Sequence, residues 1–200
     1  MNLLNNEQLV KVVLTGGPFS GKSTTTEKLA EMGYSVVRES ALDVISDLND
    51  KYGVEGQKEW RFKNFVVFQE MIVNRHMISE TKLLPSSGVV FIDRSPIDTL
   101  AFLKWQKDKP SQYTEEIASG YHCDLAFCLE TLPEFDMRED SGRTSNYQQS
   151  VEVSHLIKDE YKNLDIDVFE IGVASLEERL EMILSCVEDW INRKIDKPLQ

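Results

Sequence analysis

Residues 10–23 read VKVVLTGGPFSGKS, and this stretch decides the fold. Its first six residues are mostly β-branched and end at two glycines, a pattern typical of a buried strand that runs into a tight turn. From Lys22 onward the pattern becomes helical, with Leu29 and Met32 on one face and Gly33 at the end. The stretch therefore predicts a strand, a glycine-rich loop and a helix in direct succession.

The loop fits the pattern GxxxxGK[ST], or Walker A, at every fixed position and in the required context. Its glycines let the backbone curl so that amide groups point at a phosphate, and the helix N-terminus adds favourable electrostatics. Lys22 can reach the β- and γ-phosphates, and the Ser23 hydroxyl suits Mg²⁺. A chance match in an ordinary turn is the alternative. The residues expected to bind the nucleotide are Gly16, Gly17, Pro18, Phe19, Ser20, Gly21, Lys22, Ser23 and Thr24.

Short apolar runs alternate with helical patterns along the rest of the chain. The further expected strands span residues 34–38, 89–93, 124–130 and 166–171. The further expected helices span about 41–49, 57–84, 96–107, 113–119, 151–164 and 176–191. Strands that are apolar on both faces require helices on both sides of a parallel sheet. We therefore expect an α/β P-loop fold over residues 1–200: one domain, a three-layer α/β/α sandwich with a five-stranded parallel sheet and a lid.

Composition narrows the class of protein. The 200 residues are 41% hydrophobic and 28% charged, as in globular proteins, and the formal net charge is −12. Such a charge disfavours a broad nucleic-acid surface, and no apolar run has the length of a membrane span. Three cysteines without a CxxC pair predict reduced thiols, and no signal peptide is recognisable. We expect a cytoplasmic protein with no nucleic-acid or membrane partner.

Polar residues stand where the expected strands end. Gly16, Glu39, Asp93 and Glu130 follow four different strands. Because ligands of such sheets bind beyond the carboxyl ends of the strands, these residues are expected to converge in space. They are far apart in sequence, so the prediction depends on the parallel sheet.

The two carboxylates carry the expected chemistry. A hydroxyl is a poor nucleophile until a nearby base takes its proton, and Glu39 is placed for that role. Its alternative is a helix-capping or surface glutamate. Asp93 ends an apolar strand, as does a carboxylate that holds Mg²⁺ through water in P-loop enzymes. Its alternatives are a grip on substrate hydroxyls or a structural role.

Arg94 and Gln69 complete the expected acceptor side. Arg94 either clamps phosphate or orients Glu39, with a plain surface ion pair as the alternative. Gln69 interrupts an apolar helical stripe, and a buried amide must find hydrogen-bond partners. A ligand base edge or a backbone carbonyl would satisfy it equally well.

The polar segment 131–150 is expected to form a lid that carries Arg138 and Arg143. Arginines on a closing loop stabilise the charge that phosphoryl transfer spreads over the equatorial oxygens. Gly142 would give the loop freedom to close. Three neighbouring acidic residues make an exposed ion-pair cluster the alternative reading.

These residues resemble a known group of enzymes. Asp93-Arg94-Ser95 is similar to the acidic-Arg-Ser motif of deoxynucleoside kinases, and Glu39 matches the carboxylate that is their base for the sugar hydroxyl. Phe68-Gln69 resembles their Phe-Gln pair, in which the glutamine reads the base. Arg75 lies close to where a further substrate-site arginine would stand. The resemblance thus implies acceptor binding by Glu39, Gln69, Arg75, Asp93 and Arg94.

The order of these blocks and the acidic loop after Leu129 look closest to the AAA-type P-loop ATPase family that includes the ribosylnicotinamide kinase domain of NadR. The resemblance implies an ATP- and Mg²⁺-dependent kinase whose acceptor is ribosylnicotinamide, a deoxynucleoside or a similar molecule. The alternative is an ATP- or GTP-binding regulatory switch that hydrolyses its nucleotide slowly. Residues 172–174 would lie against adenine, and the lack of an NKxD sequence favours ATP over GTP. Residues 105–121 border either the acceptor pocket or a subunit contact, such as that of a homodimer.

Overall fold

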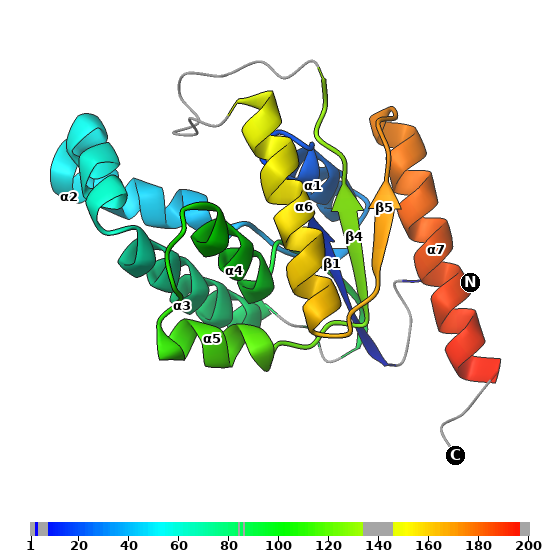
Figure 1. Ribbon diagram of the computed structural model, residues 1–200. Coiled ribbons are helices and arrows are strands. Elements are labelled where there is room, and N and C mark those ends of the chain that lie inside the picture. The colour runs from blue at the N-terminus through cyan, green and yellow to red at the C-terminus, as the bar shows by residue number, and fades with distance from the viewer. Residues whose placement is uncertain (1–2, 4–7, 84, 86, 134–145, 197–200) are drawn as a thin grey trace.

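A parallel sheet of five strands forms the centre of the protein (Figure 1). The structure is a computed structural model, and it describes residues 3, 8–83, 85, 87–133 and 146–196. The strands stand in the order β2-β3-β1-β4-β5, and all four pairings are parallel. Their bounds are β1 Leu9–Thr15, β2 Ser35–Val37, β3 Gly88–Asp93, β4 Leu125–Leu129 and β5 Val168–Ile171.

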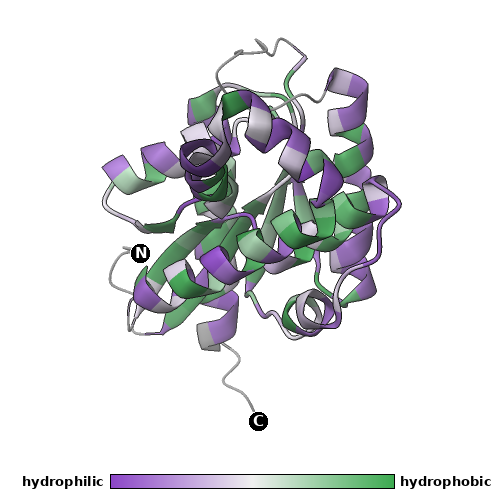
Figure 2. Cartoon of the chain, turned by 90° about the vertical axis from the view of Figure 1, so that its left-hand side faces the viewer, coloured by the Kyte–Doolittle hydropathy of each residue, from purple (hydrophilic) through white to green (hydrophobic). Residues whose placement is uncertain are grey.

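Helices cover both faces of this sheet. Val12 and Leu14 of β1 face one core, which α1 and α7 complete, while Val13 faces the other core, built with α4 and α6. This alternation is the period-2 pattern of a strand buried on both sides. The hydrophobic residues accordingly concentrate along the strands at the centre of Figure 2. The helices are α1 Lys22–Glu31, α2 Ser40–Lys63, α3 Phe65–Leu83, α4 Pro96–Trp105, α5 Gln112–Ser119, α6 Tyr147–Asn163 and α7 Leu176–Asp196. The predicted three-layer α/β/α sandwich is confirmed.

The predicted single helix over residues 57–84 is wrong. The helix is interrupted at Asn64, whose φ of −126° and ψ of 42° are not helical. The side-chain amide of Asn64 donates from Nδ2 to the carbonyl oxygen of Trp60 at 2.8 Å, and the backbone amide of Asn64 donates to the same oxygen at 2.9 Å, so both bonds cap the last turn of α2. The break turns Phe62 out of the predicted apolar stripe, and 85% of its surface is exposed.

The helix predicted over residues 41–49 extends further than its pattern. In the structure α2 continues to Lys63, with a sharp bend at Gly53, where φ is +73°. Glycine accepts this backbone conformation without the penalty that a Cβ would bring. Together α2 and α3 form a helical pair that packs through Val44, Leu48 and Phe68.

The segment predicted as a lid is described only at its two ends. Residues 131–133 follow β4, and Tyr147–Ser150 already belong to α6, so the last part of the predicted segment is helical. Asn146 caps α6 by accepting the amide of Gln149 at 2.9 Å. Arg138, Gly142 and Arg143 lie outside the described residues.

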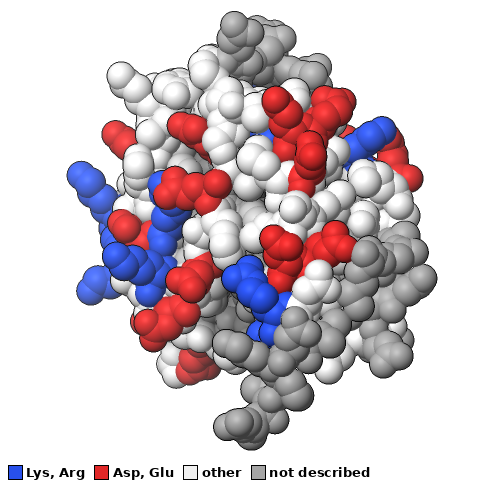
Figure 3. Space-filling view, turned by 90° about the vertical axis from the view of Figure 1, so that its right-hand side faces the viewer, with Lys and Arg blue, Asp and Glu red and all other residues white. Residues whose placement is uncertain are grey.

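Acidic side chains are spread over the face that carries α7, with basic ones between them (Figure 3). On this face the acidic side chains do not form one block. Among the described residues no helix combines the length and the apolar character needed to cross a membrane.

Candidate functional site

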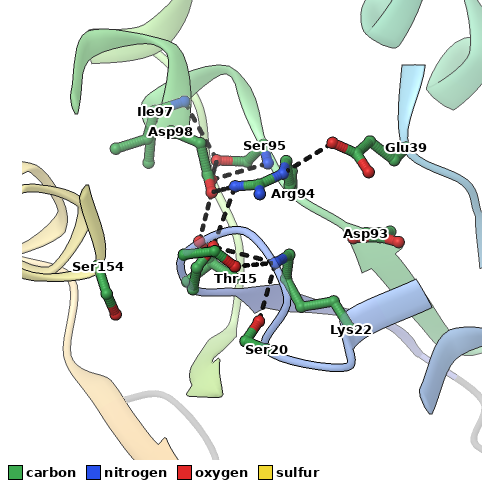
Figure 4. A network of polar contacts seen from close by, with 12 residues as sticks. Thr15, Ser20, Lys22, Glu39, Asp93, Arg94, Ser95, Ile97, Asp98 and Ser154 are labelled. Carbon is green, nitrogen blue, oxygen red and sulfur yellow. Dashed lines mark hydrogen bonds and ion pairs between the residues drawn. The ribbon is translucent and has the colours of Figure 1, made fainter. Parts of the chain in front are cut away.

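The loop between β1 and α1 curls around the amino group of Lys22. Lys22 Nζ donates to the carbonyl oxygens of Gly16 at 3.0 Å and Gly17 at 2.8 Å, and to Ser20 Oγ at 2.9 Å (Figure 4). Gly16 and Gly21 have φ values of +132° and +81°, which side chains with a Cβ rarely adopt. The loop thus has the backbone curl and the cation that a phosphate site requires.

Neighbouring backbone makes Gly17 irreplaceable. A Cβ on Gly17 would overlap the carbonyl oxygen of Ser150 at the start of α6. The carbonyl oxygen of Phe19 also accepts the amide of Leu132 at 3.2 Å. The loop is therefore fixed against both ends of the segment predicted to be the lid.

Ser23 and Asp93 form a second polar pair beside the loop. Ser23 Oγ donates to Asp93 Oδ2 at 3.1 Å, and Thr26 Oγ1 approaches the same oxygen at 3.4 Å. Asp93 Oδ1 is buried and has no hydrogen-bond partner among the described residues. A hydroxyl and a carboxylate with one unsatisfied oxygen are the kind of oxygen donors that Mg²⁺ prefers, directly or through its waters. The residues present therefore fit the metal.

The environment of Asp93 penalises its charge. Burial, and then the neighbouring charge of Glu39, raise the pKa of Asp93 to about 6. Its folded-state pKa thus lies above the usual value of 3.8, so the native protein binds the proton more tightly than the unfolded chain does. A bound cation would offset this penalty.

We expect Asp93→Asn to change how stability depends on pH. Between about pH 4 and 6 the contribution of Asp93 to the stability of the wild-type protein falls as the pH rises, because a carboxyl that is protonated in the native state becomes a buried anion. The variant lacks this titration and should gain roughly 1–3 kcal/mol relative to wild type on going from pH 4 to pH 7. Urea unfolding at both pH values without Mg²⁺ measures the difference, and an equal ΔΔG at both would contradict it.

Arg94 joins the strand ends. It is 8% exposed, with Nε donating to Glu39 Oε1 at 3.0 Å, and Nη1 donating to Asp98 Oδ1 and the Gly16 carbonyl oxygen at 3.1 Å each. Burial opposes its charge, but Glu39 and Asp98 outweigh this effect and raise the pKa of Arg94. Its φ is +70°, an uncommon value for a residue with a side chain. In Figure 4 the guanidinium lies between Glu39 and Asp98, so its hydrogen bond to Glu39 fixes the orientation of that carboxylate.

Asp98 is a site residue that sequence reasoning missed. Its Oδ2 accepts the amide of Ser95 at 3.0 Å and the hydroxyl of Tyr161 at 2.9 Å, and its Oδ1 accepts the hydroxyl of Thr15. Together with Ser95 it forms a capping box at the start of α4. The spacing Ser-x-x-Asp was a signal that could have identified it. Asp98 thus locks β1, α4, α6 and Arg94 together.

A cavity of about 190 Å³ opens next to the phosphate loop. Glu39, Asp93, Arg94 and Asp98 line its polar end, and Pro18 of the loop contributes to the same wall. Four aromatic side chains also line it: Phe65, Phe68, Phe102 and Trp105. Phe102 lies beside the polar end, with Arg94 Cζ 5.1 Å from its ring centroid. Flat apolar walls with a few convergent polar groups are typical of small-molecule sites.

Only some of the residues predicted to bind the acceptor line the cavity. Gln69 is buried and lines the cavity, and its Oε1 has no hydrogen-bond partner among the described residues. Arg75 does not line the cavity but forms an ion pair with Asp47 between α3 and α2. The next residue, His76, lines the cavity, with Nε2 3.0 Å from Glu80 Oε2.

The structure also bears on the alternative roles that the sequence left open for Glu39 and for residues 105–121. Glu39 occupies the N-cap position of α2, but its side chain makes no capping hydrogen bond. Trp105 and Gln106 line the cavity. Farther along, Ser111 Oγ donates to Glu70 at 2.6 Å, which ties the start of α5 to α3. This segment therefore borders the cavity at its beginning and packs on α3 beyond it.

Comparisons with known proteins agree with this architecture. A family model described as AAA domain matches residues 11–179. No curated protein matches the sequence. Among solved structures, deoxyadenosine kinase from M. mycoides with bound dCTP is 14% identical, with a TM-score of 0.61 over 90% of this chain and 100% of that one.

Two further structures share the fold. Thymidylate kinase from Candida albicans is 15% identical, with a TM-score of 0.58 over 92% of each chain. The NadR protein in complex with NR is 14% identical, with a TM-score of 0.61 over 90% of this chain and 49% of that one. At these identities the likeness establishes a common fold. With its phosphate loop, its parallel sheet and a family match over residues 11–179, this chain belongs to the AAA domain family of P-loop proteins.

Proposed function

We propose that this protein is an ATP-dependent kinase that transfers the γ-phosphate to a hydroxyl of a nucleoside or nucleoside-like molecule. The observation that carries the proposal is the position of the cavity. Glu39, Asp93 and Arg94 line it, and it begins at Pro18 of the phosphate loop. A molecule in the cavity would therefore lie next to a nucleotide held by the loop, which is the arrangement that direct transfer requires.

The donor side of the proposal rests on the loop and the strand ends. The backbone of residues 16–23 and Lys22 would bind the phosphates of ATP, and Thr24 follows at the start of α1. Ser23 and Asp93 would hold Mg²⁺, which neutralises phosphate charge when it is bound. Arg138 and Arg143 remain proposed lid residues that stabilise the charge of the transferred group.

The acceptor side rests on the chemistry of the cavity wall. Phe65 and Phe68 offer flat apolar surfaces to a base, and Gln69 offers a buried amide to its polar edge. At the other end Glu39 would accept the proton of the reacting hydroxyl, and Arg94 would hold that carboxylate in place. One pocket would thus separate base recognition from chemistry.

The structural neighbours support the acceptor class. One is named a deoxyadenosine kinase, another a thymidylate kinase, and the NadR structure contains NR. The first two names denote enzymes that phosphorylate a nucleoside and a nucleotide. We propose a nucleoside-like acceptor because Gln69 and the aromatic side chains fit a base. Among the lining residues the three carboxylates of Glu39, Asp93 and Asp98 also outnumber the two arginines, Arg61 and Arg94, which disfavours an acceptor phosphate.

The decisive experiment is a phosphate-transfer screen. Purified protein is incubated with labelled ATP and Mg²⁺, alone and with a panel that includes ribosylnicotinamide, deoxynucleosides and ribonucleosides. We expect at least one member to accelerate ATP consumption and to carry the label. Consumption that is slow and equal with every acceptor would instead support a nucleotide-dependent regulatory switch.

A further inference from the structure

Arg179 of α7 contacts the phosphate loop at Ser20 and Gly21. It is 3% exposed, although it is a cation on a helix whose neighbouring residues Glu177 and Glu178 are exposed. Arg179 Nη1 donates to the carbonyl oxygen of Ser20 at 2.6 Å, and Nη2 approaches the carbonyl oxygen of Glu130 at 3.4 Å. One guanidinium thus links the loop to the end of β4.

The bond to Ser20 fixes the direction of one peptide group. In a trans peptide the C=O of one residue and the N–H of the next point in opposite directions. Because the Ser20 carbonyl points at Arg179, the amide of Gly21 must point away from Arg179. Gly21 has φ +81°, and a Cβ there would lie 3.3 Å from Arg179 Nη1, so the guanidinium packs directly against this turn.

The charge of Arg179 is poorly compensated within the described residues. It forms two hydrogen bonds to carbonyl oxygens there and no ion pair, and burial lowers its pKa while the more distant charge of Glu130 opposes the shift. A buried cation without a paired anion is costly in free energy. A polyphosphate on the other side of the loop would supply the missing negative charge across a thin, low-dielectric layer.

We propose that Arg179 is a positioning residue of the phosphate site. It holds the Ser20–Gly21 peptide so that the Gly21 amide faces the bound phosphates, and it adds positive charge behind the loop. The inference rests on the nucleotide site of the proposed function but is independent of the acceptor. A purely structural role, in which Arg179 only attaches α7 to the sheet, makes a different prediction.

The test compares the binding of two probes, ATP and inorganic tripolyphosphate, to wild type, Arg179→Met and Arg179→Lys by calorimetry. We expect Arg179→Met to weaken both probes by about tenfold or more, because it loses a hydrogen bond from a charged donor and the charge behind the loop. The two probes should lose affinity by the same factor, since the site recognises phosphate. Arg179→Lys keeps the charge on a single donor nitrogen, without the forked geometry, and should recover part of the affinity.

The control is Arg193→Met, which removes an exposed arginine from the same helix and should leave both affinities unchanged. Thermal unfolding without ligand measures the stability of each variant, so that a loss of stability is distinguished from a loss of phosphate affinity. Unchanged phosphate affinity in folded Arg179→Met, or a loss for ATP that tripolyphosphate does not share, would overturn the proposal. If Arg179→Met does not fold, equal affinities of Arg179→Lys and wild type would overturn it. A wild-type protein that binds both probes but phosphorylates no acceptor refutes the proposed kinase function and leaves this comparison valid.

Discussion

Replacing Glu39 by glutamine should lower the rate of phosphate transfer by roughly 100- to 10,000-fold, which is the usual contribution of a general base. Glutamine has nearly the same shape and can still accept the hydrogen bond from Arg94 Nε, so the cavity should keep its form. Only the ability to take the hydroxyl proton is lost. The affinity for ATP, measured separately by calorimetry, should remain close to that of wild type because Glu39 is not part of the loop.

A matched control for this variant is Glu55→Gln, an exposed glutamate of the same helix that pairs with Lys58. It should transfer phosphate at the wild-type rate. Glu39→Gln with near-normal turnover would rule out a general base at this position. A parallel loss of ATP affinity and transfer would assign Glu39 a structural role instead.

Replacing Arg94 by methionine should lower the free energy of unfolding by about 3–5 kcal/mol at neutral pH, the usual effect of removing one partner from a buried ion pair. The substitution leaves Glu39 and Asp98 buried without their cation, next to Asp93. Urea denaturation at neutral pH measures the loss.

Arg75→Met provides the comparison, because Arg75 pairs with Asp47 on a more exposed part of the surface. Exposed pairs contribute about 0–1 kcal/mol, so its effect should be small. Equal losses for the two variants would contradict the role of Arg94 as the central cation. If Arg94→Met is too unstable to purify, Arg94→Lys retains a charge without the forked geometry and should show a smaller loss.

Local patterns in the sequence were sufficient for the sheet and the phosphate loop. The β-branched run before Gly16 predicts β1, and the spacing from Gly16 to Ser23 predicts the loop, because each depends on neighbouring residues only. The meeting of Glu39, Asp93 and Arg94 also followed from the sequence, since parallel strands bring their carboxyl ends to one edge. Their catalytic roles remain predictions.

Local patterns were insufficient where the backbone changes direction within an apolar stretch. Apolar periodicity continues through Asn64, yet the φ of −126° and ψ of 42° of this residue are not helical, and α2 ends there. The residue that lines the cavity is one position later than expected. Arg75 faces Asp47 instead, and His76 lies in the cavity wall. Helical spacing alone cannot resolve such a shift when the start of the helix is not known.

By itself the sequence determined a parallel α/β sheet, a phosphate-binding loop and carboxylates at the adjoining strand ends, because these follow from local periodicity and from chain direction. Only the tertiary structure decided how Arg94 is shared between Glu39 and Asp98, and that Arg179 is buried against Ser20. These contacts join residues as far as 159 positions apart. The burial of a charged side chain depends on which carbonyl and carboxylate oxygens surround it after folding, and no pattern within one segment records that.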